Sequence, residues 1–248
     1  MLDNLEDMKK TAGEIAKKLN KSYYDLDNEN ELHMYIVGSV GRKTAISGSS
    51  DLDVLFDLPA NIYSKYNAYS DNGQSALIQD VKNVLKEKYP NTDIRGDGQV
   101  VVIAFNKYTV ELVPGFKQAD DRFKYPDTHD GGSWKYTDPL SEQSACTECE
   151  NESDGKYYNF CHIIRSWKNH IGIKMGGLLI DTLVYDFFNE NGCFVDDSEK
   201  NYLEILQSLF ENLKNQDKDR SYWYAMGSNQ CVYNSDNGKF ISKAKKAY

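Results

Sequence analysis

The chain has 248 residues and a net charge of -9 at pH 7, so it is long enough to bury a full core in one large unit or two packed lobes. The acidic balance argues against a protein that coats duplex nucleic acid, because such binding depends on Lys and Arg neutralising phosphates. Small anionic substrates remain compatible with it, since a local cationic or metal-filled pocket overrides the overall sign. Neither a stretch of ~18 apolar residues nor a signal-peptide pattern is present, so we expect a soluble, cytoplasmic protein without membrane insertion.

The first 139 residues mix helical and strand patterns. Apolar residues at helical spacing predict an amphipathic helix within residues 1–20, and "SALIQDVKNVLKEKY" predicts a second helix over 75–89. Short runs rich in β-branched residues predict strands at 33–37 and 52–58, and an antiparallel hairpin from "QVVVIAF" (99–105) and "YTVELVPGF" (108–116).

After Pro139 the periodicity becomes helical. Helices are predicted over 157–170, 176–191 and 198–216, with a short basic helix over 238–248. We therefore expect an α+β protein with a mixed-sheet N-terminal lobe, residues 1–139, and a helical lobe with a basic tail, residues 140–248. The glycine-rich segment 126–139 is the expected crossing, and the opening helix is expected to pack on the second lobe.

Five cysteines without a secretory signal indicate reduced thiols. The pair "CTEC" at 146–149, followed by Cys161 and His162, leaves a zinc site as an alternative. Buried thiols are the more ordinary interpretation, since the pair-plus-pair spacing of structural zinc sites is missing.

The stretch "YIVGSVGRKTAISGSSDLDVLFDLP", residues 35–59, carries the chemistry. Asp51 and Asp53 are two apart in a predicted strand, so their side chains share one face and can bind a common divalent cation. Gly38 lets the backbone approach a ligand closely, and Ser39 offers a hydroxyl and an N–H to phosphate oxygens. The order strand, Gly-Ser turn and paired aspartates predicts a site for a metal-bound triphosphate.

A third carboxylate is expected on a neighbouring strand, because two ions need more ligands than two aspartates provide. Glu111 fits, since it lies mid-strand between Val110 and Leu112, where a carboxylate is costly unless it is paired or metal-bound.

These residues resemble the nucleotidyltransferase superfamily signature. More narrowly, "GSVGRKTAISGSSDLDVLFDLP", "VELVPGF", "GGSWKYTDP", "CHIIRSWKNH" and "GGLLIDTL" resemble the branch that contains cyclic GMP-AMP synthase, oligoadenylate synthases and the bacterial CD-NTases of antiphage defence. The resemblance covers residues 30–190 and implies a polymerase beta-like fold whose first lobe is catalytic.

The resemblance implies a role for each matching residue. Gly38 and Ser39 bind the triphosphate, and Asp51, Asp53 and Glu111 hold two Mg²⁺ ions, with Mn²⁺ as an alternative. Most relatives have Asp in place of Glu111. Arg165 and Lys168 lie on one face of a helix, where relatives place a basic side chain against the triphosphate tail; exposed helix cations are the competing interpretation. Relatives often have a serine where this chain has Gly176 and Gly177.

The acceptor in most CD-NTases is another nucleotide, and their product is a cyclic or linear oligonucleotide signal. Here Tyr248 follows a lysine-rich segment, which resembles the tail of a defence nucleotidyltransferase that primes single-stranded DNA on a terminal tyrosine and works with a membrane effector. We therefore expect template-independent polymerisation of dATP or another deoxynucleotide from Tyr248. The conventional second-messenger synthase, a catalytically dead nucleotide-binding module and a nucleotide-transferring toxin are the alternatives.

Overall fold

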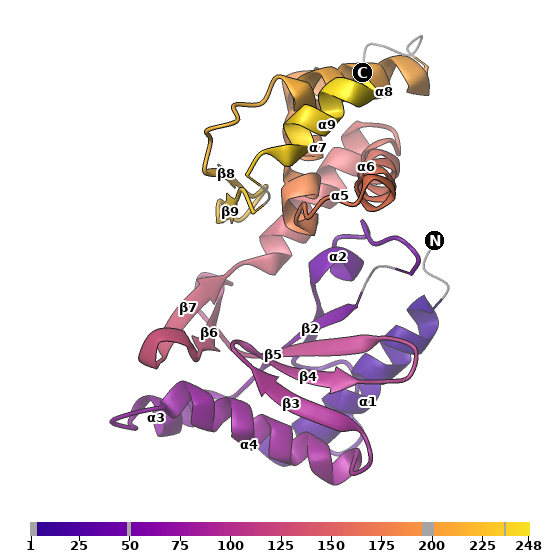
Figure 1. The fold of residues 1–248 in the computed structure, drawn as a ribbon. Helices are drawn as coiled ribbons and strands as arrows, with labels where there is room; N and C mark the ends of the chain where they lie inside the picture. Colours follow the sequence, from indigo (N-terminus) through magenta and orange to yellow (C-terminus); the bar gives the residue numbers. More distant parts are fainter. Residues whose placement is uncertain (1–3, 49–50, 195–200, 236) are drawn as a thin grey trace. The chain divides into compact units, whose positions relative to one another are not determined.

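The computed structural model describes residues 4–48, 51–194, 201–235 and 237–248. It divides into two compact units, each shown as a ribbon in Figure 1. Residues 1–41 and 47–139 form the first unit, and residues 42–46 and 140–248 form the second. The start of the predicted helix over 198–216 and residues 1–3 of the opening helix lie outside the described residues.

The first unit contains a seven-stranded mixed sheet. Its strands are β1 (Met34–Ile36), β2 (Leu52–Asp57), β3 (Asp93–Asp97), β4 (Val100–Ala104), β5 (Thr109–Lys117), β6 (Phe123–Asp127) and β7 (Ser133–Thr137). The main order is β1-β2-β5-β4-β3, and β6 extends the sheet from the end of β5 and pairs with β7. Among the strand pairs of this sheet in the described residues, β2–β5 alone is parallel.

The described residues of this unit also form the helices α1 (Leu5–Tyr24), α2 (Gly38–Gly41), α3 (Ala60–Asn67) and α4 (Gly73–Lys88), together with a 3-10 turn at His129–Gly131. The α1 helix buries Met8, Ala12, Ile15 and Leu19, which recur at helical spacing. It packs against α4, β1 and β2, and Figure 1 shows α1 and α4 on the same side of the sheet. Together these two helices cover the sheet's apolar face.

The second unit is mostly helical. It contains α5 (Pro139–Glu152), α6 (Tyr157–Ile171), α7 (Gly177–Glu190), α8 (Tyr202–Lys214) and α9 (Lys239–Ala247), with the hairpin strands β8 (Tyr222–Tyr224) and β9 (Cys231–Tyr233) and a 3-10 turn at Gly192–Phe194. Phe160, Phe188, Trp223 and Phe240 are fully buried in its core. Within the described ranges, no helix combines the length and apolar character that crossing a membrane requires.

The predicted α+β architecture is confirmed, with a mixed sheet in the first unit and helices in the second. The opening helix belongs to the first unit, where α4 and the sheet cover its apolar face; its packing on the second lobe stays a prediction. Within the expected crossing, residues 126–137 form the end of β6, the 3-10 turn and β7, and the first unit ends at Pro139.

Candidate active site

The parallel pair of β2 and β5 brings two of the predicted carboxylates onto adjacent strands. Asp53 lies opposite Glu111 in the register, and both side chains are half-buried. Leu52 and Val54 on either side of Asp53 are fully buried, so strand alternation directs Asp53 away from the apolar layer. The register thus explains how carboxylates 58 residues apart in sequence become neighbours in the sheet.

The Gly-Ser turn lies directly against Asp53. The N–H of Val37 donates to the Asp53 carbonyl oxygen at 2.9 Å, and Gly38 has a φ of +61°. A Cβ added at Gly38 would lie 1.8 Å from Oδ2 of Asp53. Glycine is therefore needed here for two reasons, the left-handed backbone and the contact with the carboxylate. Ser39 follows, half-buried, in the short helix α2.

Asp51 occupies a different position from the one predicted. It precedes β2, which begins at Leu52, and it is exposed. The backbone N–H of Thr109, at the start of β5, lies 3.4 Å from its Oδ1. Burial raises the pKa of Glu111, and the negative charges of Asp51 and Asp97 raise it further, while Arg95 partly opposes them. Asp51 is thus close enough to Glu111 for their charges to interact.

The chemistry of these donors fits a hard divalent cation, because carboxylate oxygens are the ligands that Mg²⁺ and Mn²⁺ prefer. The close approach of Gly38 to Asp53 leaves no side chain between the turn and that carboxylate. In the described part of the chain, however, no three His, Cys, Asp or Glu side chains form a ready-made metal-binding group. The residues fit the metal chemically, and the two-ion site remains a proposal.

The two predicted cationic residues lie on α6 in the second unit; Lys168 is partly buried, and the side chain of Arg165 is only 11% exposed. The guanidinium of Arg165 contacts Asp181, with Nη2 2.7 Å from both carboxylate oxygens, and also donates to the carbonyl oxygen of Gly177 at 3.0 Å. A Cβ at Gly177 would lie 2.7 Å from Nη1 of Arg165, whereas one at Gly176 would meet nothing within 4 Å. Contact of Arg165 or Lys168 with a triphosphate stays a prediction.

Sequence reasoning missed the residues to which Arg165 is bound. Asp181 is fully buried on α7 and also accepts hydrogen bonds from Arg42 and Thr44. A signal was present in the sequence, because Asp181 is a lone carboxylate inside the apolar run "GGLLIDTLV". A buried carboxylate requires a charged or hydrogen-bonding partner, and the Arg42 that supplies it comes from the stretch that contains the Gly-Ser turn.

Tyr248 follows the last residue of α9, where its N–H donates to the Ala244 carbonyl oxygen at 2.9 Å. Phe240 and Ala244 are fully buried and fix this helix in the second unit. The Tyr248 side chain is 53% exposed, and the Lys214 ammonium group lies over its ring at 3.1 Å from the centroid. The phenol therefore stands at the surface beside a cation.

The cysteines do not support the zinc alternative. Cys146, Cys149 and Cys161 are buried in the apolar core of the second unit, and burial raises the pKa of Cys146 to about 12, against the thiolate that zinc requires. No group of metal-ligating residues is found at these positions within the described ranges.

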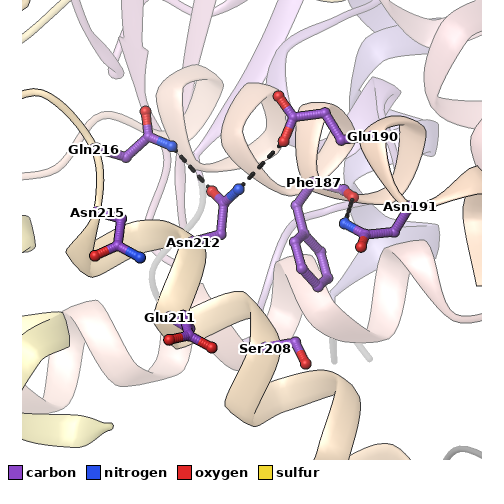
Figure 2. A pocket seen from close by; sticks show the side chains of 8 residues that line it. All are labelled: Phe187, Glu190, Asn191, Ser208, Glu211, Asn212, Asn215 and Gln216. Atoms are coloured by element: carbon purple, nitrogen blue, oxygen red, sulfur yellow. Dashed lines mark hydrogen bonds between the residues drawn. The ribbon is translucent and has the colours of Figure 1, made fainter.

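A polar hollow of about 530 Å³ opens between α7 and α8. Figure 2 shows its amide side chains in a chain of hydrogen bonds, from Gln216 to Asn212 at 2.9 Å and from Asn212 to Glu190 at 3.3 Å. None of the predicted site residues lines it.

Comparison with known proteins identifies similar chains. The model of the Second Messenger Oligonucleotide or Dinucleotide Synthetase domain matches residues 2–150. A probable cyclic nucleotide synthase of Bacillus cereus (strain VD146) is 23% identical over 205 residues, which are 71% of this chain and 60% of that protein. The chain thus spans about 60% of the length of this curated relative.

Solved structures of low sequence identity share the fold. A CdnE cyclic dinucleotide synthase of Elizabethkingia meningoseptica, with GTP and Apcpp, has a TM-score of 0.70 at 14% identity, covering 100% of this chain and 98% of that one. CdnC of E. coli MS115-1, with ATP, has a TM-score of 0.68 at 17% identity, covering 98% and 84%. The chain therefore has the nucleotidyltransferase fold of these proteins.

Proposed function

Because the chain belongs to the family of the Second Messenger Oligonucleotide or Dinucleotide Synthetase domain, we propose that it is a metal-dependent nucleotidyltransferase that joins nucleoside triphosphates into an oligonucleotide signal. The observation that carries this proposal is the register that sets Asp53 beside Glu111, with the backbone of the Gly-Ser turn against Asp53. The printed names of the relatives describe cyclic nucleotide and cyclic dinucleotide synthases, which is consistent with a soluble signal as the product.

Each residue of the candidate site has its own role in the proposed reaction. Gly38 lets the backbone approach the triphosphate, and Ser39 donates its hydroxyl and N–H to phosphate oxygens. The oxygen of an acceptor hydroxyl attacks the α-phosphorus, the bond from that phosphorus to the bridging oxygen breaks, and pyrophosphate leaves. Glu111 takes the proton of the acceptor as a general base. Divalent ions held by Asp51, Asp53 and Glu111 would neutralise the triphosphate and acidify the acceptor.

The proposal is tested by measuring pyrophosphate release in the presence of magnesium. Each ribonucleoside and deoxyribonucleoside triphosphate is supplied in turn. The double substitution Asp51→Asn with Asp53→Asn should reduce turnover by at least about 10³-fold, because the charges that bind the ions are removed. Asp57→Asn is the matched control, since Asp57 lies on the same strand and its carboxylate accepts a hydrogen bond from the backbone N–H of Lys117 at 2.7 Å. Undiminished turnover in the double variant would contradict the assigned site.

A second candidate concerns the acceptor. The exposed phenol of Tyr248 beside Lys214 favours priming by the protein itself, and the tail resembles that of Hailong protein B, a defence nucleotidyltransferase that builds single-stranded DNA on a C-terminal tyrosine. On this proposal the substrate is dATP or another deoxynucleotide, the product is sensed by a membrane effector, and the context is antiphage defence. If a nucleotide is the acceptor instead, the product is a conventional cyclic or linear messenger.

A further inference from the structure

A buried cluster of charges holds residues 42–46 in the second unit. Asp181, which is fully buried, accepts from Nε of Arg42 at 3.0 Å and from the Thr44 hydroxyl at 2.8 Å. Arg165 binds the same carboxylate from another helix, and its Nη2 also lies 3.1 Å from Oγ1 of Thr44. The carboxylate of Asp181 thus accepts hydrogen bonds from two arginines and a threonine.

A second carboxylate balances the charge. Glu142 on α5 lies 3.0 Å from Nη1 of Arg42 and also accepts from Ser228 and Gln230. Burial opposes the charge of Arg42, but Asp181 and Glu142 outweigh it and raise the pKa of that guanidinium. Among the described residues, no buried side-chain nitrogen or oxygen lacks a partner. Losing one member of such a cluster leaves an uncompensated buried charge, which is costly.

Residues 42–44 are anchored at three consecutive positions. Besides Arg42 and Thr44, the carbonyl oxygen of Lys43 lies 3.2 Å from Nε2 of His162 on α6. The segment follows Gly41, the last residue of the short helix that contains Ser39. The anchored segment therefore begins three residues after Ser39, on the C-terminal side of the Gly-Ser turn.

We propose that Asp181, Arg42 and Arg165 are positioning residues for triphosphate binding, with Arg165 acting through Asp181 and Thr44 rather than by contact with phosphate. This inference rests on the proposed function. The geometry of Gly177 supports it, because a Cβ there would displace the Arg165 guanidinium from its place against the Gly177 carbonyl oxygen. The absence of a side chain at Gly177 thus leaves room for the guanidinium of Arg165.

The test compares Arg165→Ala, Asp181→Asn and the double variant. Affinity for the α,β-methylene form of the preferred triphosphate is measured by calorimetry, and KM and kcat are measured alongside, well below each variant's melting temperature. We expect both single variants to weaken binding and raise KM by about tenfold, and the double variant to be no worse than either, since residues of one network are not additive. If Arg165 binds phosphate directly, Asp181→Asn keeps affinity while Arg165→Ala loses it, which would overturn the proposal.

Asp181→Asn removes a buried charge. Two substitutions of Thr44 disturb the cluster less and provide a second comparison. Thr44→Val removes only the hydroxyl between Asp181 and Arg165 and should raise KM several-fold with little change in kcat, whereas Thr44→Ser keeps the hydroxyl and should behave like wild type. The exposed pair of Arg122 and Asp120 is the matched control, and Arg122→Ala should change neither KM nor affinity. Wild-type KM in Thr44→Val would overturn the positioning role alone. A wild-type protein that releases no pyrophosphate would overturn the proposed function and this role with it.

Discussion

Gly38 shows how one backbone position shapes the candidate site. Gly38→Ala would place a methyl group 1.8 Å from Oδ2 of Asp53, in addition to the strain of a φ of +61°. Because the carboxylate must move, we expect kcat for pyrophosphate release to fall by about 10²-fold or more. Gly172→Ala is the control, since Gly172 has a φ of +67° but no atom within 4 Å of its added Cβ. It should cost about 1 kcal/mol of stability and leave kcat unchanged. Equal kcat losses in the two variants would show that strain, not displacement of Asp53, is responsible.

The ionisation of Glu111 links the melting temperature of the protein to metal binding. Burial and the charges of Asp51 and Asp97 raise its pKa, so the folded protein loses stability as the pH rises from the ordinary carboxyl range through that raised value. Without metal at pH 7, Glu111→Gln should therefore raise the melting temperature by roughly 1 to 3 °C, a small change because the group is partly exposed. The gain should vanish below about pH 4, where the wild-type carboxyl is neutral as well.

Magnesium should reverse the order of the melting temperatures of the wild type and Glu111→Gln. A bound cation favours the ionised carboxylate, so Mg²⁺ should raise the melting temperature of the wild type more than that of Glu111→Gln. Glu29→Gln, at an exposed position of the first unit, is the control and should respond like the wild type. An equal response of the wild type and Glu111→Gln would remove Glu111 from the metal site.

Arg165 marks the limit of sequence reasoning at the residue scale. Its family position predicted a phosphate contact, which stays a prediction, but did not indicate its partners, Asp181 on another helix and Thr44 121 residues earlier. Spacing along one helix does not disclose such partners, because they depend on how separate elements pack. Gly38, Asp53 and Glu111, in contrast, lie within short local patterns, which is why their residue types indicated a site before the fold was known.

The elements that were predicted have strong internal periodicity, and those that were missed do not. The buried face of helix α5, with the sequence "PLSEQSACTECENE", consists mainly of the small residues Ala145, Cys146 and Cys149 together with Glu142, and β3 and β7 are mostly exposed. Their structure comes from tertiary pairing, since β3 forms a ladder with β4 and β7 with β6. Sequence patterns reveal faces that must be buried, and these elements contribute few such faces.

The hypothesis that Tyr248, at the end of α9, primes synthesis can be tested directly. Tyr248→Phe removes only the phenol oxygen, so it should stop initiation from mononucleotides while triphosphate binding and the packing of Phe240 remain unchanged. An added oligonucleotide with a free 3′-hydroxyl should restore extension, because the proposed catalytic carboxylates are intact. Intact mass spectra of the wild type should show nucleotide adducts on the terminal peptide. Normal polymerisation by Tyr248→Phe, with no adduct on the wild type, would leave a nucleotide as the acceptor.

At the scale of the whole molecule, a cut at 139/140 would not isolate the second unit. A fragment of residues 140–248 lacks Arg42 and Thr44, so Asp181 and Glu142 lose partners that are buried in the full chain. The cost of an unpaired buried charge is about 3–5 kcal/mol, and we expect fast amide exchange along α7 of the fragment. A synthetic peptide of residues 40–48 should slow that exchange, and the same peptide with Arg42→Ala should not. Exchange as slow in the fragment alone as in the full chain would contradict the anchoring role.

The position of residues 42–46 in the sequence also determines the order in which parts of the protein can fold during synthesis. Arg42 leaves the ribosome 139 residues before Asp181, which at ordinary rates of synthesis is a delay on the order of 10 s. All seven strands of the large sheet precede Pro139, so that sheet can form while Arg42 still has no carboxylate to bind. The cluster closes only after α7 has been made, so a guanidinium that precedes β2 in the chain completes a core whose helices are synthesised after the sheet.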